Sequence, residues 1–142
     1  MGNSYTIGSL ILYKLHFLNK EINSKFPGCT GVSQSRLELL QQLYQEDELS
    51  QQELQKILDI DNAAITRHLK QLESSEMVVR RKKTSDNRVT LVKLTEYGRQ
   101  KISLFQKEKD LFVTSMLEDF NEEERNLLLV MLDRLENNIQ KI

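Results

Sequence analysis

The chain has 142 residues, with 20 Lys and Arg against 21 Asp and Glu, and a formal net charge of −1 at pH 7. This length predicts a single domain, and the composition, 39% hydrophobic and 29% charged, is typical of a water-soluble globular protein. One cysteine excludes a disulfide-built scaffold, and no apolar run approaches the ~20 residues that cross a bilayer, so we expect a cytoplasmic protein without membrane contact.

The charge is distributed unevenly along the chain. A net charge near zero argues, as a single number, against a nucleic-acid partner. However, residues 61–101 hold ten basic and five acidic side chains, whereas residues 33–60 hold two basic and six acidic ones. A local excess of positive charge produces a local field whatever the total, so residues 61–101 are the candidate surface for an anionic partner. The alternative is an ordinary solvated face.

Helical periodicity dominates the N-terminal part of the chain. Apolar side chains recur at three- and four-residue steps from Leu10 to Phe17 and predict a first helix over about residues 4–25. Pro27-Gly28 is expected to end it. Ser33 is a suitable N-cap for a second helix. The expected buried face of that helix carries Leu37, Leu40, Leu43 and Tyr44.

Two short helices follow in close succession. The sequence from Ser50 to Glu53 matches a capping box and predicts the start of a third helix. Asp61 is expected to cap a fourth helix, after a tight connection at Asp59-Ile60. The inward face of that fourth helix should carry Ile65, Leu69 and Leu72. Two short helices joined by so brief a turn predict a helix-turn-helix.

The periodicity then changes from helical to extended. Residues 77–81 and 89–94 are rich in β-prone side chains, and the second segment alternates. The polar residues 82–88 between them predict a β-hairpin with a basic tip. A helix-turn-helix followed directly by such a hairpin is a winged helix, so the expected fold class is mostly α with a small β-hairpin.

Two further helices complete the predicted fold. Thr95 is expected to cap a long fifth helix, and Asn121 a sixth, whose first turn places three glutamates at the positive end of the helix dipole. Residues 127–132, with Leu135 and Ile139, make the sixth helix apolar around more than half its circumference. A helix of this kind needs more cover than one small domain provides, which predicts a partner chain.

Four motifs carry a family resemblance. Ser50-x-x-Glu53-Leu54, Ala64-Ile65-Thr66-Arg67, Asp86-x-Arg88 and Leu94-Thr95-x-x-Gly98 occur in the order and spacing of the MarR family of bacterial transcriptional regulators, which the chain resembles over essentially its whole length. The resemblance implies one domain over residues 1–142. A winged helix over residues 32–99 would be flanked by dimerisation helices over residues 1–31 and 100–142. The implied partners are a second copy and a palindromic double-stranded DNA operator.

Three positions depart from the family pattern. Glu76 stands where the family usually has glycine, at a position that favours left-handed backbone, and should cost about 1 kcal/mol there. Asn87 replaces a basic residue in the middle of the wing, and Gln71 replaces a frequent arginine. The last two changes bear on contacts with phosphate groups.

The outward face of the fourth helix and the wing supply side chains that suit DNA. Asn62 and Arg67 have the bidentate geometries that match adenine and guanine. Arg88 suits a narrow minor groove, and Asp86 can hold that guanidinium or stabilise the turn. The candidate DNA-binding residues are Ser50, Gln51, Asn62, Ala63, Thr66, Arg67, Lys70, Lys82, Lys83, Asp86 and Arg88.

The resemblance also implies regulation, since most members are repressors that release DNA on binding a small molecule or on thiol oxidation. It places the effector pocket along the first helix, where Tyr13, His16 and Phe17 are the candidates; the alternative for His16 is a core or surface role. Cys29, expected in the connection after that helix, is either an unremarkable thiol or an oxidation sensor. His68 should pack beside the inward stripe of the fourth helix.

No cofactor, metal cluster or catalytic set is predicted, and we do not expect an enzyme. The predicted function is a dimeric, sequence-specific DNA-binding transcriptional regulator, a repressor released by a small-molecule effector. Two alternatives stay open. One is a winged-helix module for protein contacts without DNA binding, and the other is a regulator that senses thiol oxidation through Cys29.

Overall fold

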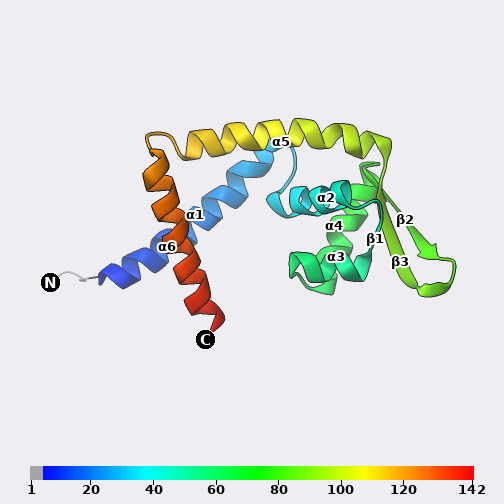
Figure 1. Cartoon of the computed structure of the whole chain (residues 1–142), viewed down its shortest axis with the longest axis horizontal. Helices are drawn as coiled ribbons and strands as arrows, with labels where there is room; N and C mark the ends of the chain where they lie inside the picture. The colour runs from blue at the N-terminus through cyan, green and yellow to red at the C-terminus, as the bar shows by residue number, and fades with distance from the viewer. Residues whose placement is uncertain (1–4) are drawn as a thin grey trace. The chain divides into compact units, whose positions relative to one another are not determined.

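The computed structural model describes residues 5–142, which form six helices and a three-stranded antiparallel sheet (Figure 1). They divide into two compact units, with the boundary between Lys109 and Asp110. The helices are α1 (Ile7–Thr30), α2 (Gln34–Gln45), α3 (Gln51–Leu58), α4 (Asn62–Ser74), α5 (Glu96–Met116) and α6 (Glu122–Gln140). The strands are β1 (Leu49–Ser50), β2 (Val78–Lys83) and β3 (Asp86–Leu94).

Side-chain caps begin the helices where the sequence predicts them. Ser33, Ser50, Asp61 and Asn121 each accept a hydrogen bond from the backbone amide three residues later. At the start of α3 the capping box is complete, because Glu53 N donates to Ser50 Oγ and Ser50 N to Glu53 Oε1, both at 3.0 Å. The start of α1 is set by a cap at Thr6. The predicted start near Ser4 lies outside the described residues.

The prediction that Pro27-Gly28 ends the first helix is wrong, because α1 continues through Pro27 to Thr30. Proline removes one helical N–H, but Phe26 and Thr30 are buried and hold the last turn in place. Thr30 Oγ1 donates to Phe26 O at 2.8 Å. The helix ends at Gly31, whose φ of 85° is the left-handed conformation that a C-terminal cap requires.

The winged-helix core is built from the apolar faces of α2, α3, α4 and the sheet. The predicted inward stripe of α4, Ile65, Leu69 and Leu72, is at most 2% exposed. On α2 the prediction is wrong for Tyr44, which is 51% exposed and lies under the Arg99 guanidinium, 5.6 Å from the ring centroid. Leu39 is fully buried instead. The α2 core positions are therefore Leu37, Leu39, Leu40 and Leu43.

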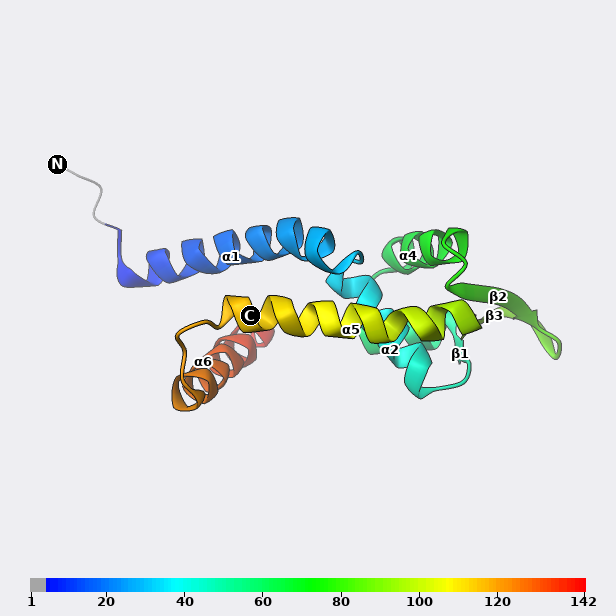
Figure 2. The same cartoon turned by 90° about the horizontal axis from the view of Figure 1, so that it is seen from above.

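The sheet has the order β1-β3-β2, and β1 is an element that the sequence analysis does not predict. The hairpin of β2 and β3 extends past α4 and the first turns of α5 (Figure 2). Its turn consists of Thr84 and Ser85 alone, so the predicted tip over residues 82–88 is too long. Lys82 pairs with Thr90 and Lys83 with Asp86, so residues 87–89 form a bulge in β3.

In the second unit, α6 has no buried residue. Its apolar residues Leu127 to Leu132 are between 37% and 59% exposed. This agrees with the predicted shortage of cover for this helix. In the part of the chain that the structure describes, no helix combines the length and hydropathy needed to cross a membrane.

Candidate nucleic-acid interface

One face of α4 is exposed along its first two turns, opposite the buried stripe. All five residues predicted to face outward from this helix are exposed: Asn62, Ala63, Thr66, Arg67 and Lys70. The residues just before α4 set the direction of this helix. Asp59 turns the chain with a left-handed φ of 51°, and the Asp61 carboxylate accepts the Ala64 amide at 2.7 Å. The fold thus presents these side chains together on one surface.

A polar pocket connects α3, α4 and the hairpin. It has a volume of about 260 Å³. Four of the predicted DNA-binding residues, Ser50, Gln51, Asn62 and Arg88, contribute to its lining, and the other lining residues are Gln52, Gln55, Val89 and Thr90. Residues from three separate elements therefore share one concave polar surface, which the sequence pattern does not predict.

Ser50 differs from the other predicted DNA-binding residues because it is buried. It is only 8% exposed, and its hydroxyl is the acceptor of the α3 cap. Glu53, which completes the cap, has a lowered pKa because it accepts the Ser50 backbone N–H and hydroxyl hydrogen bonds. The main role of the Ser50 side chain in this structure is to begin α3, and Gln51 beside it is the residue directed towards α4.

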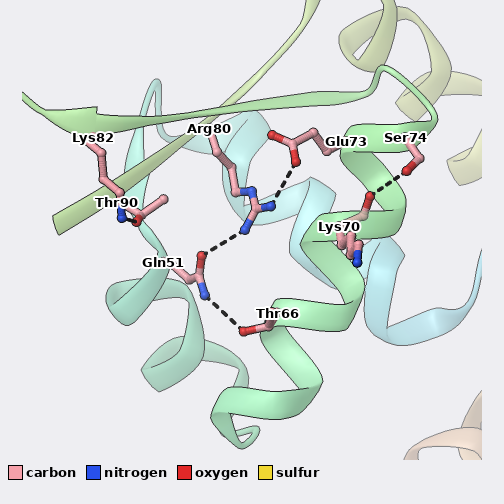
Figure 3. Close-up of polar contacts among 8 residues, drawn as sticks. All are labelled: Gln51, Thr66, Lys70, Glu73, Ser74, Arg80, Lys82 and Thr90. Atoms are coloured by element: carbon pink, nitrogen blue, oxygen red, sulfur yellow. Dashed lines mark hydrogen bonds and ion pairs between the residues drawn. The ribbon is translucent and has the colours of Figure 1, made fainter. Parts of the chain in front are cut away.

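A chain of polar contacts joins β2, α4 and α3 (Figure 3). Arg80 Nη2 donates to Glu73 Oε1 at 2.9 Å, and Arg80 Nη1 to Gln51 Oε1 at 3.5 Å. Gln51 Nε2 in turn donates to Thr66 Oγ1 at 3.4 Å. The hydrogen bond from Arg80 is the main cause of the lowered pKa of Glu73. Sequence reasoning missed this network, since its members are separated by up to 29 residues.

Arg80 is the central residue of this network. Its side chain is 25% exposed, and its Nε is buried without a hydrogen-bond partner among the described residues. An unsatisfied buried N–H costs roughly 1–3 kcal/mol. The guanidinium is therefore kept in position by its two terminal nitrogens alone.

The hairpin carries an internal ion pair. Asp86 Oδ1 accepts both the Arg88 backbone amide, at 3.0 Å, and Arg88 Nε, at 3.1 Å. Asp86 therefore fills both roles that the sequence left open, since it closes the turn and holds the guanidinium. These hydrogen bonds lower its pKa. The Arg88 side chain remains 91% exposed, and Lys83 is exposed as well, while Lys82 Nζ donates to Thr90 Oγ1 at 3.2 Å.

Arg81, the residue of β2 that follows Arg80, forms an ion pair with a different part of the fold. Arg81 donates through Nη2 and Nε to the two oxygens of Glu48, at 2.9 Å and 3.2 Å. Glu48 lies just before β1, so this pair ties β2 to the connection that follows α2. Arg80 and Arg81 are adjacent in sequence, but they form ion pairs with different elements.

His68 lies where it was predicted, beside the inward stripe of α4. It is half-buried, and its Nδ1 accepts a hydrogen bond from Arg36 Nε at 3.2 Å. Burial, followed by the positive charges of Arg36 and Arg67, lowers the pKa of His68. This contact ties α2 to the side of α4 next to the exposed Arg67.

The candidate effector residues lie on α1. Tyr13 is 68% exposed, Phe17 is 47% exposed, and His16 is exposed as well, so a single chain does not enclose them. Cys29 is exposed in the last turn of α1, and its predicted place in the following connection is wrong because the helix extends past Pro27. Within the described residues no three His, Cys, Asp or Glu side chains form a metal-binding group.

Comparison with known proteins assigns this architecture. A family model described as MarR family matches residues 32–90. An uncharacterized HTH-type transcriptional regulator of Bacillus subtilis, YdgJ, is 57% identical over 132 residues, covering 93% of this chain and 80% of the relative. The HTH-type transcriptional repressor YetL of B. subtilis is 29% identical over 135 residues, covering 90% and 80%. The crystal structure of a MarR mutant from E. coli complexed with operator DNA has a TM-score of 0.77 at 22% identity, covering 93% of this chain and 99% of that one.

Proposed function

The chain belongs to the MarR family of HTH-type transcriptional regulators, and from this we propose that it is a dimeric repressor that binds a palindromic operator. The observation that carries the proposal is the shared surface of α3, α4 and the hairpin. It gathers Gln51, Asn62 and Arg88 around one polar pocket, and Asn62 shares α4 with the exposed Arg67. A concave, polar, cationic surface beside an exposed helix suits duplex DNA.

In the proposed complex α4 lies in the major groove. Asn62 and Arg67 read base edges there, because an amide matches adenine and a guanidinium matches guanine in bidentate geometry. Ala63 is small enough to let the helix approach the bases closely. Lys70 and Gln51 contact phosphates, which add affinity but no sequence information. Lys82, Lys83 and Arg88 bring the wing to the backbone and the adjacent minor groove.

A second copy of this chain is the proposed cover for α6. All six apolar residues from Leu127 to Leu132 of this helix are exposed, and Leu10, Ile11 and Leu12 of α1 are exposed as well. Exposed apolar faces of this kind mark surfaces that bind another protein chain. A closed twofold dimer buries the same surface of both copies. It would present two winged helices related by twofold symmetry, and for that reason the proposed operator is palindromic.

A small-molecule effector is proposed to bind along α1 and release the DNA. Tyr13 and Phe17 offer exposed aromatic rings, and His16 between them offers a polar ring nitrogen. Such a mixture of apolar surface and a few polar groups is typical of sites for small organic ligands. Because one chain leaves these residues open, the proposed site is completed in the dimer.

The test is to map the DNA bound by this protein across its genome and to measure binding of the purified protein to the recovered sites. We expect a shared palindromic motif. Arg67→Ala should weaken binding to it by about 5- to 150-fold, the equivalent of one bidentate base contact. Lys20→Ala, which removes an exposed charge from α1, is the control. If the wild-type protein binds no recovered or promoter DNA at low salt, the protein-interaction alternative replaces this proposal.

A further inference from the structure

The contact chain from Glu73 through Arg80 and Gln51 to Thr66 ends on two of the residues proposed to meet DNA (Figure 3). Glu73 lies in the last turn of α4, whereas Gln51 begins α3 and Thr66 lies on the exposed face of α4. This series of hydrogen bonds therefore links the Glu73 carboxylate, which lies outside the proposed DNA-contact surface, to Gln51 and Thr66 within that surface.

The charges of Glu73 and Arg80 determine which group donates and which accepts along this series of hydrogen bonds. An ionised carboxylate only accepts and a guanidinium only donates, so Arg80 must face the Gln51 amide at its oxygen. The NH₂ end of that amide is then turned to Thr66, which is the arrangement observed, with Gln51 Nε2 donating to Thr66 Oγ1. No reversal of the Gln51 amide satisfies both neighbours.

The Thr66 hydroxyl can only accept, and not donate, a further hydrogen bond. Its single proton is donated to the Asn62 carbonyl oxygen at 2.8 Å, and one lone pair accepts from Gln51. What remains is a second lone pair. The Gln51 amide likewise retains one N–H that is not directed to Thr66.

We propose that Glu73 is a positioning residue for DNA recognition: acting through Arg80, it keeps the NH₂ end of Gln51 turned to Thr66, so that the Thr66 proton stays on the Asn62 carbonyl and Thr66 offers DNA an acceptor while Gln51 offers a donor. Thr66 then selects an exocyclic amino group in the major groove, on adenine or cytosine, against the acceptor atoms of guanine and thymine. Gln51 donates to a phosphate oxygen. The inference rests on the proposed function, and it adds the base chemistry that one position of α4 reads.

The network is not needed to hold β2 in place. That strand is already paired with β3 along its length, and the Glu48–Arg81 ion pair fixes the adjacent residue. Glu73 has a side chain that is 41% exposed, so its removal opens no cavity in the core. What Glu73 alone supplies is the acceptor that sets the Arg80 guanidinium against Gln51.

Selection from a random duplex library, followed by sequencing, tests the proposal. The variant is Glu73→Ala, and the matched control is Glu48→Ala, which removes the same charge from the ion pair of the next residue on the same strand. We expect wild type and control to select the same motif. Glu73→Ala should lose about two- to tenfold of its discrimination at one base pair, the worth of a single hydrogen bond. Thr66→Val should lose it at the same base pair, and Thr66→Ser should keep it.

A base analogue gives a direct readout. At that base pair, purine in place of adenine, or 2-pyrimidinone in place of cytosine, removes only the amino group. The substitution should weaken wild-type binding about two- to tenfold and leave Glu73→Ala and Thr66→Val unaffected, whereas a merely structural role of Glu73 would not produce this pattern.

Two outcomes would overturn the inference while the proposed function stands. One is an unchanged motif for Glu73→Ala, and the other is equal relaxation by Glu73→Ala and Glu48→Ala. If the folded wild-type protein selects no sequence at all, the proposed function itself fails. Circular dichroism and thermal melting of each variant identify any that does not fold. In that event the analogue experiment on wild type and Thr66→Val decides the acceptor role of Thr66.

Discussion

Arg36 donates from Nε to Nδ1 of His68 at 3.2 Å, so a side chain that is always protonated holds the acceptor nitrogen of a half-buried imidazole. The contact joins α2 to α4 on the side of α4 next to Arg67. It requires a neutral His68, because a second proton on the ring would occupy Nδ1 and place two positive groups in contact.

This relationship predicts a pH dependence of stability. The pKa of His68 is lowered from 6.5 by burial and then by Arg36 and Arg67, so the unfolded chain binds this proton more readily than the native protein. The contribution is fully present above about pH 6.5 and is lost as the pH falls towards the native pKa. We expect the free energy of unfolding, measured by urea titration, to fall between pH 7.5 and 5.5. The lowered carboxylate pKa values act only at more acidic pH.

Two variants test whether His68 causes this dependence of the free energy of unfolding on pH. His68→Asn keeps an acceptor for Arg36 but cannot titrate, so it should flatten the slope over this range. Arg36→Gln removes the neighbouring charge and keeps a donor, so part of the slope should remain, because burial of the imidazole is unchanged. An equally steep slope in His68→Asn would show that another group is responsible.

Arg88 is predicted to add affinity without much sequence selectivity. Its side chain is 91% exposed and is aimed by Asp86, so Arg88→Ala should weaken binding to many DNA sequences and reduce the slope of log K against log salt by about one unit. The measurement is fluorescence anisotropy at several salt concentrations. Lys20→Ala serves as the control for loss of one charge. Unchanged affinity at every salt concentration would contradict the wing contact.

The apolar surface of α6 predicts a charge-sensitive dimer. Leu127 and Met131 are 54% and 47% exposed and lie one helical turn apart, so two glutamates there would place uncompensated charge in the interface. Light scattering should find twice the 16.7 kDa chain mass for wild type and a single chain for Leu127→Glu/Met131→Glu. The control Asn126→Glu/Asn137→Glu adds the same charge at polar positions of α6. A wild-type monomer, or a dimer that survives the first pair, contradicts the assignment.

The backbone conformation of Glu76 lowers the stability of the native protein, and a substitution can remove this effect. Its φ of 61° is left-handed, as predicted for the end of α4, and glycine adopts that conformation without steric penalty. Glu76→Gly should raise the free energy of unfolding by up to about 1 kcal/mol, measured by denaturant titration. Ser75→Gly is the matched control, since Ser75 has a φ of −84°, and it should bring no gain. Equal effects of both substitutions would mean that φ is not the cause.

Cys29 is predicted to have no sensing role. It is exposed in the last turn of α1, and with one cysteine in the sequence its reversible oxidation could give only a sulfenate, a mixed disulfide or a bridge between copies. Peroxide treatment should leave DNA affinity unchanged in wild type and in Cys29→Ser alike. Loss of binding in wild type that Cys29→Ser prevents would establish the thiol-sensing alternative.

Local signals in the sequence predicted most of the fold correctly. The caps at Ser33, Ser50, Asp61 and Asn121 are contacts between residues three apart, and each begins a helix as expected. The exposed and buried faces of α4 follow from helical periodicity alone. The family resemblance supplied the left-handed turn at Glu76, which side-chain preference would not have indicated.

The errors arose where distant residues decide the local conformation. Pro27 is typical of a helix end, but burial of Phe26 and Thr30 extends α1 to Thr30. The strand β1 has two residues and exists because Leu49 and Ser50 pair with Val92 and Leu91. The path from Glu73 to Thr66 passes through β2 and α3, and no short-range pattern contains it.

Gly98 in the first turn of α5 determines how the hairpin base meets that helix. A methyl group there would overlap the Met77 carbonyl oxygen, which accepts from the Thr95 amide at 3.0 Å, while the Thr95 hydroxyl donates to Glu76 O at 2.7 Å. The base of the hairpin and the start of α5 are thus in direct backbone contact, with no room for a side chain at position 98. A rotation of the first turn of α5 would therefore move the base of the hairpin with it, and in the proposed complex this couples the angle of the wing to the orientation of that helix.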